Sequence, residues 1–145
     1  RALAKLVDFI SVGSNDLTQY LLGVDRNNPR VADLYSAFHP AVLNALQHVV
    51  FEAQKEKKSV SICGEMAGDP GAAVLLMAMG FDILSMNAAT LLRVKSVIRS
   101  VSLGSAHDLL EQVMQMDDAQ MIRSAVDMTL YDSGVDRLLR SSRTN

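Results

Sequence analysis

The sequence predicts an α/β fold built around a small parallel sheet. Three short apolar segments rich in β-branched and aromatic residues alternate with longer segments in which apolar residues recur at helical spacing. The order is β-α-(α)-β-α-β-α followed by two further helices, which is typical of parallel βα units. A (β/α)8 barrel takes about 250 residues, roughly 30 for each unit, so three units with terminal helices correspond to its last part. An open doubly wound sheet fits the same order, although it normally contains more strands.

The first unit opens with a strand predicted over residues 7–12. Its valine, phenylalanine and isoleucine residues are typical of strands, and Gly13 ends the apolar run. A short helix is predicted over residues 16–22, with Ser14 and Asn15 as candidates for its N-cap.

A longer helix completes this unit after a polar loop at residues 25–30 and a short segment around Leu34 and Tyr35. Pro40 suits the first position of a helix, because it has no N–H to leave unpaired there. The helix is predicted to end in the lysine-rich run at residues 55–58, where positive charge is favoured by the helix dipole.

The second unit has clear boundaries. A strand is predicted over residues 59–63 and ends at Gly64. A helix follows at residues 70–79, opened by Pro70 and closed by Gly80.

The third unit and the chain end contribute a strand and three helices. The strand is predicted over residues 81–86, and the helices over residues 90–101, 105–116 and 118–139. In the first of these helices the residues expected to point inward are Leu91, Val94, Val97 and Ile98. Residues 1–145 are therefore interpreted as one domain, with three βα units at 1–101 and C-terminal helices at 102–145.

Composition excludes several classes of protein. The chain is 49% hydrophobic and carries 14 Lys and Arg against 16 Asp and Glu, a formal net charge of −2. Disorder needs lower hydrophobicity, and a nucleic-acid module usually has a basic excess. No segment approaches the roughly 20 apolar residues of a membrane span, and the start lacks a signal-peptide pattern. We therefore expect a cytoplasmic protein without nucleic-acid or membrane partners.

Because it begins at Arg1 within an amphipathic pattern, we also expect a piece of a longer protein.

Polar and small residues follow each predicted strand, at residues 13–16, 63–69 and 87–90. Ligands of parallel βα folds bind at the carboxyl ends of the strands, so these segments form the candidate site. Asp16 offers a hard oxygen ligand suited to Mg²⁺, and Arg26 can bind a phosphate or a carboxylate through two hydrogen bonds.

Each of these residues also has an ordinary structural interpretation. Ser14 or Asn15 can cap a helix, Asp16 can stabilise its N-terminus, and Arg26 can be a surface charge. Cys63, the single cysteine, is either a proton donor or nucleophile at the rim or inert packing. The histidines lack ligand spacing and are interpreted as structural: His39 before a helix-starting proline, His48 near an apolar helix face and His107 on the surface.

Three segments carry a family resemblance: residues 9–20 (FISVGSNDLTQY), 23–28 (GVDRNN) and 61–70 (SICGEMAGDP). They resemble, in order, the C-terminal domain of the phosphoenolpyruvate-utilising enzymes, and the likeness covers essentially the whole chain. Within that superfamily the chain is most similar to enzyme I of the phosphotransferase system, and Met66, Pro70 and residues 78–82 favour the nitrogen-related paralogue. Pyruvate phosphate dikinase and phosphoenolpyruvate synthase share parts of the same motifs and are the second choice.

The resemblance implies a (β/α)8 barrel whose parent enzyme binds phosphoenolpyruvate with Mg²⁺, passes the phosphoryl group to a histidine on a separate domain and releases pyruvate. It implies that Asp16 is a magnesium ligand, that Asn15 and Arg26 contact the phosphate, and that Cys63 protonates the enolate carbon. Phosphoryl transfer depends mainly on positioning and charge neutralisation, which a metal and a guanidinium provide. A thiol that is protonated at neutral pH can serve as the acid.

The same resemblance implies partners. The phosphoryl group would pass to a phosphocarrier protein of the HPr type through an N-terminal domain of the parent, and the parent would be a homodimer. Further ligands belong to earlier barrel units, so the isolated chain is predicted to be inactive. The alternative is a non-catalytic dimerisation or regulatory module.

Overall fold

The computed structural model describes residues 1–134 of the chain. Within them the strands are β1 (Phe9–Gly13), β2 (Ser59–Cys63) and β3 (Ile83–Ser85). The α-helices are α1 (Ser14–Leu22), α2 (Pro40–Lys55), α3 (Pro70–Met79), α4 (Ala88–Ser100), α5 (Leu103–Val113) and α6 (Ala119–Asp132). Short 3₁₀ helices occur at η1 (Ala4–Leu6), η2 (Ala32–Leu34) and η3 (Met66–Gly68). The predicted α/β class is confirmed.

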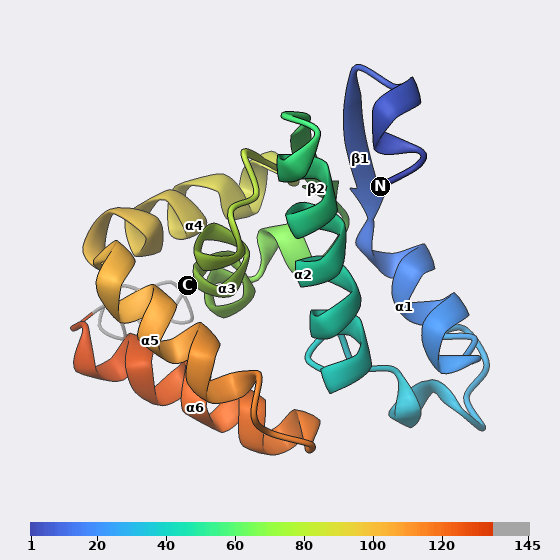
Figure 1. The fold of residues 1–145 in the computed structure, drawn as a ribbon. Helices are drawn as coiled ribbons and strands as arrows, with labels where there is room; N and C mark the ends of the chain where they lie inside the picture. Colours follow the sequence, from blue (N-terminus) through green and yellow to red (C-terminus); the bar gives the residue numbers. More distant parts are fainter. Residues whose placement is uncertain (135–145) are drawn as a thin grey trace.

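The three strands form one parallel sheet in the order β1-β2-β3. Residues Gly13, Cys63 and Ser85 lie side by side in the register, so the three strands end level with one another. Figure 1 shows α2 and α3 in front of the sheet. Helices α5 and α6 pack against α3 at the lower left of this view, and α1 lies at the right, where it contacts α2.

The sheet is apolar on one face only. Along β1 and β2 the residues that point toward the helices, among them Val12, Val60 and Ile62, are buried in the core. The opposite face carries the alternate residues, Phe9, Ser11, Ser59, Ser61, Cys63, Ile83 and Ser85, and most of them are exposed. Phe9 and Ile83 expose 64% and 55% of their surface. Nothing within residues 1–134 covers this face, which we call the open face of the sheet.

Helix α3 forms the centre of the packing. Its residues are buried all round, except for the half-buried Pro70 and Met77, because it lies between the sheet, α4, α5 and α6. Its start is well determined, since the Asp69 side chain accepts hydrogen bonds from the backbone N–H groups of Gly71 and Ala72 and Pro70 occupies the first turn. Gly80 ends it with a left-handed conformation, φ +94°.

Several predicted boundaries need correction. The first strand begins at Phe9 rather than at residue 7, and the third covers only Ile83–Ser85 rather than 81–86. The third is short because Asp82 Oδ2 accepts the backbone N–H of Val60 at 2.8 Å, so a side chain takes the place of the next ladder bond.

The helix ends also differ. Helix α1 begins at Ser14 and takes Gly13 as its N-cap, so the capping predicted for Ser14 and Asn15 is wrong. Helices α4 and α5 begin two residues earlier than predicted, because Asn87 and Ser102 cap them. Leu91 is exposed, not inward, since the buried stripe of α4 contains Val94 and Val97. Helix α6 runs from Ala119 to Asp132, and the predicted end at residue 139 lies outside the described residues.

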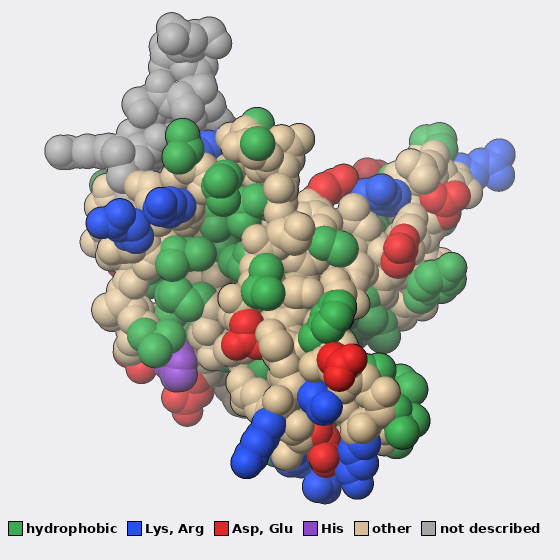
Figure 2. Space-filling view, turned by 90° about the horizontal axis from the view of Figure 1, so that it is seen from above, with side chains coloured by type: hydrophobic (Ala, Val, Ile, Leu, Met, Phe, Trp, Pro, Cys, Tyr) green, Lys and Arg blue, Asp and Glu red, His purple; other side chains and the backbone are tan. Residues whose placement is uncertain are grey.

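The surface carries no dominant sign of charge in the view of Figure 2, where basic and acidic side chains lie among hydrophobic ones. Within residues 1–134 no helix is long and apolar enough to cross a membrane.

Candidate active site

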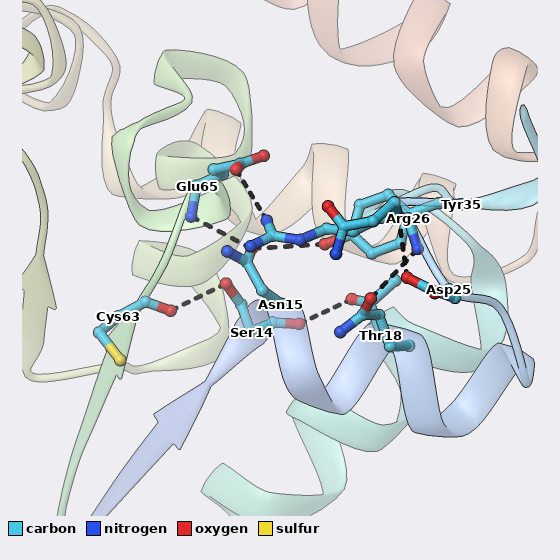
Figure 3. A network of polar contacts seen from close by, with 10 residues as sticks. Ser14, Asn15, Thr18, Asp25, Arg26, Tyr35, Cys63 and Glu65 are labelled. Atoms are coloured by element: carbon cyan, nitrogen blue, oxygen red, sulfur yellow. Dashed lines mark hydrogen bonds and ion pairs between the residues drawn. The ribbon is translucent and has the colours of Figure 1, made fainter. Parts of the chain in front are cut away.

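The candidate site lies at the carboxyl edge of the sheet, where the three strands end in register. The segments that leave Gly13, Cys63 and Ser85 are the polar stretches predicted to carry the chemistry. Figure 3 shows the first two of these segments joined by a network of polar contacts with the loop that follows α1. The structure therefore brings together residues that lie about 50 positions apart in the sequence.

Ser14 fixes the start of α1 against the end of β2. Its hydroxyl donates to the carbonyl oxygen of Cys63 at 2.8 Å, and the Thr18 hydroxyl donates to the carbonyl of Ser14 at 2.8 Å. Both hydroxyl side chains are buried. Because a buried hydroxyl needs a partner, these two bonds hold the first turn of α1 in one position relative to β2.

Gly64 allows the chain to pass very close to α1. It has a φ of +107°, and a Cβ built there would lie 2.4 Å from Ser14 Oγ and 3.2 Å from Asn15 Oδ1. Both the backbone conformation and the lack of space require glycine. The next residue, Glu65, can therefore donate its backbone N–H to Asn15 Oδ1 at 3.4 Å.

Asn15 is oriented by two donors. Its Oδ1 atom accepts from the Glu65 backbone and from the Tyr35 hydroxyl, the latter at 3.3 Å. Burial raises the pKa of the Tyr35 phenol, so this hydroxyl keeps its proton and remains a donor at neutral pH. With its oxygen occupied, the amide nitrogen of Asn15 is the atom available to donate to an anion.

Arg26 lies between this network and the loop after β2. Its Nη1 donates to Glu65 Oε1 at 2.8 Å, and its backbone N–H donates to Gln19 Oε1 at 3.1 Å. The Arg26 side chain is 35% exposed and that of Glu65 is 76% exposed, so the ion pair lies largely in solvent. Such a pair orients the guanidinium but adds little to stability, and within residues 1–134 the other guanidinium donors remain free to bind a phosphate or a carboxylate.

Asp16 is exposed in the first turn of α1. Its carboxylate lies close to Gly13, since a Cβ built at that glycine would be 3.7 Å from Asp16 Oδ2. Within residues 1–134 no group of three or more His, Cys, Asp or Glu side chains is placed to hold a metal ion. Mg²⁺ often binds through one or two carboxylates and completes its shell with water and substrate phosphate. The donor set within residues 1–134 therefore fits one protein ligand to Mg²⁺ and no closed metal site.

Cys63 ends β2 on the open face of the sheet and is exposed. Figure 3 shows its carbonyl directed to Ser14 and its sulfur on the other side, away from that hydrogen bond. The interpretation of Cys63 as inert buried packing is therefore wrong for the described residues.

A hollow of about 400 Å³ lies beside the network. Its lining comes from all three strand ends and the segments after them: Asn15, Gly64, Glu65, Gly68, Ser85, Met86, Asn87 and Thr90. A hollow at this edge is where the ligands of parallel βα folds bind.

The site contains residues that sequence patterns did not single out. Tyr35 was expected only as part of a short segment, because nothing in its neighbours indicates that it contacts Asn15. The histidines take no part in the network. His39 caps α2 through its Nδ1, which accepts from the backbone of Ala41, and His48 is exposed instead of lying near an apolar face.

These features define a class of protein: a parallel βα domain whose strand ends carry an asparagine, an exposed carboxylate and a thiol, with an arginine from the loop after α1 bound beside them. Comparison of the sequence with known families narrows the class. The family described as "PEP-utilising enzyme, PEP-binding domain" matches residues 1–103, and the chain belongs to this family.

Curated relatives agree with the family assignment. The chain is 43% identical over 138 residues to the Salmonella typhimurium protein named "Phosphoenolpyruvate-dependent phosphotransferase system", covering 95% of this chain and 18% of that protein. The Escherichia coli protein of the same name matches with the same identity and coverage. A Haemophilus influenzae protein named "Phosphoenolpyruvate-protein phosphotransferase" is 40% identical over 134 residues, 92% of this chain and 23% of that protein. The chain thus spans about a fifth of the length of these relatives.

Proposed function

We propose that this chain supplies the last three βα units of a (β/α)8 barrel in a longer phosphoenolpyruvate–protein phosphotransferase. The observation that carries the proposal is the network that joins Asn15 and Arg26 through Glu65, at the sheet edge where Cys63 ends β2, in a chain of the phosphoenolpyruvate-utilising family. The open face of the sheet and the unpaired outer edges of β1 and β3 are what a partial barrel leaves exposed. We prefer this enzyme to a dikinase or a synthase because the relatives described above are named phosphotransferases.

In the proposed reaction, Arg26 and Asn15 bind the phosphoryl group of phosphoenolpyruvate. The guanidinium neutralises charge on the phosphoryl oxygens, and the Asn15 amide, oriented by Tyr35, adds a hydrogen bond. The substrate would have to share the Arg26 guanidinium with Glu65. The exposed position of the Glu65 side chain permits this. Asp16 would hold a Mg²⁺ ion, which, when bound, supplies further positive charge at the phosphate.

Cys63 is proposed as the proton donor. When the bond between phosphorus and the enol oxygen breaks, the phosphoryl group moves to a histidine nitrogen and the electron pair stays on the enolate. The methylene carbon of the enolate then takes the proton of the Cys63 thiol, which gives pyruvate and a thiolate that solvent reprotonates. The exposed position of Cys63 at the strand end supports this role.

The remaining parts of the proposal concern the parent protein. We place the accepting histidine on a separate domain, with a phosphocarrier protein of the HPr type as the next acceptor, in a cytoplasmic homodimer. We favour the nitrogen-related branch on the residues that carry that resemblance, Met66, Pro70 and 78–82. Sedimentation tests the dimer, and a strict monomer of the parent at micromolar concentration would contradict it.

A graft tests the catalytic proposal. This chain replaces the matching 134 residues of the Haemophilus relative, and pyruvate release from phosphoenolpyruvate is measured. We expect turnover from the graft, and a loss of about 10²- to 10⁴-fold after Cys63→Ala, with substrate binding retained. Ser59→Ala is the matched control, since Ser59 lies on the same strand and face at the opposite end. A Cys63→Ala graft that releases pyruvate within twofold of the unmodified graft would remove Cys63 from this role.

The isolated chain makes a second test. Because it carries one proposed metal ligand and one proposed phosphate-binding arginine, we expect neither tight phosphoenolpyruvate binding nor turnover. Robust turnover by the purified chain would show that the other barrel units are dispensable.

A further inference from the structure

The loop that carries Gly64 and Glu65 ends at Asp69, and this aspartate is held by a residue from a distant helix. Asp69 Oδ1 accepts the backbone N–H groups of Gly71 and Ala72, at 2.8 and 2.9 Å, and caps α3. Asp69 Oδ2 accepts a hydrogen bond from Arg123 Nη1 of α6 at 2.7 Å. One carboxylate therefore joins the end of the site loop both to α3 and to α6.

Arg123 is itself held from several sides. Its Nε donates to the carboxylate of Asp127, one turn further along α6, at 3.1 and 3.2 Å, and its guanidinium lies 4.9 Å from the centre of the Phe38 ring. Partial burial acts to lower the pKa of Arg123, but the hydrogen bonds and charges of Asp69 and Asp127 outweigh it and raise the pKa. The guanidinium is therefore charged at every working pH and has one preferred orientation.

Close packing places α6 against the start of α3. A Cβ added at Gly71 would lie 2.5 Å from Val126 Cγ1 and 3.2 Å from Asp69 Oδ1. The absence of a side chain at Gly71 lets the two helices meet directly beside Asp69. Arg123 thus reaches Asp69 from a helix whose position is determined by packing.

The segment between Asp69 and Glu65 is a short hydrogen-bonded turn. It forms the 3₁₀ turn η3, in which the backbone N–H of Gly68 donates to the carbonyl of Glu65 at 3.0 Å and that of Asp69 to the carbonyl of Met66 at 3.2 Å. Met66 and Ala67 are buried. This turn is the route by which a displacement of Asp69 would reach Glu65, whose Oε1 accepts a hydrogen bond from Arg26.

We propose that Arg123 is a positioning residue for the phosphate-binding arginine: through Asp69 and η3 it determines where Glu65 holds the Arg26 guanidinium. The relevance to catalysis depends on the function proposed above, whereas the coupling between the two arginines does not. Arg123 lies outside residues 1–103, the part that matches the family. The C-terminal helices therefore contribute to the site without touching it.

The first test uses nuclear magnetic resonance on the chain without ligand. The readouts are the Arg26 Nε–Hε signal and the backbone amide of Glu65, which a purely stabilising role of Arg123 would leave unchanged. Arg123→Met should shift both signals, and Arg123→Lys should shift them less because it keeps the charge. Asp69→Asn keeps a good N-cap for α3 but loses the ion pair, so it should reproduce the shifts of Arg123→Met. The double variant should add no further shift, since both changes break the same link.

Arg99→Met serves as the matched control, because Arg99 is an exposed arginine at the end of α4. The proposal is overturned if Arg123→Met moves the Arg26 and Glu65 signals no more than Arg99→Met does, while the Asp69 and Gly71 amides shift. It is equally overturned if the shifts of Asp69→Asn and Arg123→Met add up in the double variant. Should Arg123→Met unfold, Arg123→Lys and Asp69→Asn carry the same comparison.

The second test uses the graft described above. Arg123→Met should raise the KM for phosphoenolpyruvate about threefold to tenfold and change kcat by less than twofold, because a misplaced Arg26 weakens phosphate binding. An unchanged KM together with a lowered kcat would contradict the proposal. A graft without any turnover would count against the proposed function, while the resonance experiment would still decide whether Arg123 and Arg26 are coupled.

Discussion

Replacing Gly64 by alanine should damage both the fold and the candidate site. The change adds one Cβ at a position with φ +107°, where it would lie 2.4 Å from Ser14 Oγ. Because Ser14 is buried and its hydroxyl donates to the Cys63 carbonyl, the hydroxyl cannot move without losing this bond.

The size of the effect follows from two contributions. A residue other than glycine in such a backbone conformation costs about 1–3 kcal/mol. A buried hydroxyl without a partner costs about another 1–3 kcal/mol. We therefore expect Gly64→Ala to lower the free energy of unfolding by about 2–6 kcal/mol, a large part of the roughly 5–15 kcal/mol typical of a folded domain.

Gly23→Ala is the matched control. Gly23 also has a positive φ, +62°, but nothing lies within 4 Å of a Cβ built there. Its replacement should cost only about 1–2 kcal/mol, the cost of a left-handed conformation for alanine. Urea unfolding followed by circular dichroism measures both variants under the same conditions.

A double variant separates the two contributions to the cost of Gly64→Ala. Ser14→Ala removes the oxygen that the new Cβ would meet, so Gly64→Ala should cost about 1–3 kcal/mol less in that background than in the original chain. The reasoning is refuted if Gly64→Ala and Gly23→Ala are equally destabilising within about 0.5 kcal/mol, or if Ser14→Ala gives no relief.

Three further predictions concern residues described above. Tyr35→Phe should remove an ionisation step above pH 10.0 from the absorbance titration of phenolate, because the folded pKa is raised. The stability linked to this raised pKa is present below the ordinary tyrosine pKa and lost as pH rises through the folded value, so the free energy of unfolding of Tyr35→Phe should fall less steeply with rising pH on the alkaline side than that of the original chain. Asp118→Ala should cost about 1 kcal/mol in urea unfolding, since Asp118 Oδ1 accepts two backbone N–H groups at the start of α6, and Asp118→Asn should cost less. Leu46→Ala should cost about 2–5 kcal/mol because Leu46 is fully buried in the core, and a smaller loss would mean that the core collapses into the cavity.

The elements with strong local signals could be predicted from the sequence. The strand at residues 59–63 and the helix at 70–79 have the predicted bounds, because glycine and proline mark their ends. Asp69 and Gly80 reinforce those ends through backbone hydrogen bonds that depend only on neighbouring residues.

The contacts that build the site depend on tertiary structure and could not be predicted in the same way. Ser14 has the composition of a helix cap, yet its hydroxyl binds a carbonyl 49 residues away. Glu65 lies in the predicted polar segment at residues 63–69, but its pairing with Arg26 depends on how the two loops are placed in space. Arg123 gave no signal at all, since its role depends on how α6 packs against α3.

The open face of the sheet has a consequence for assembly. Most of its side chains are small and carry a hydroxyl group. Apart from Phe9 and Ile83, the face therefore has little apolar surface that would cause nonspecific association. The outer edges of β1 and β3, in contrast, present main-chain donors and acceptors that a strand from another polypeptide can pair with directly. In the barrel proposed above, these two edges are where the remaining strands would pair with this sheet.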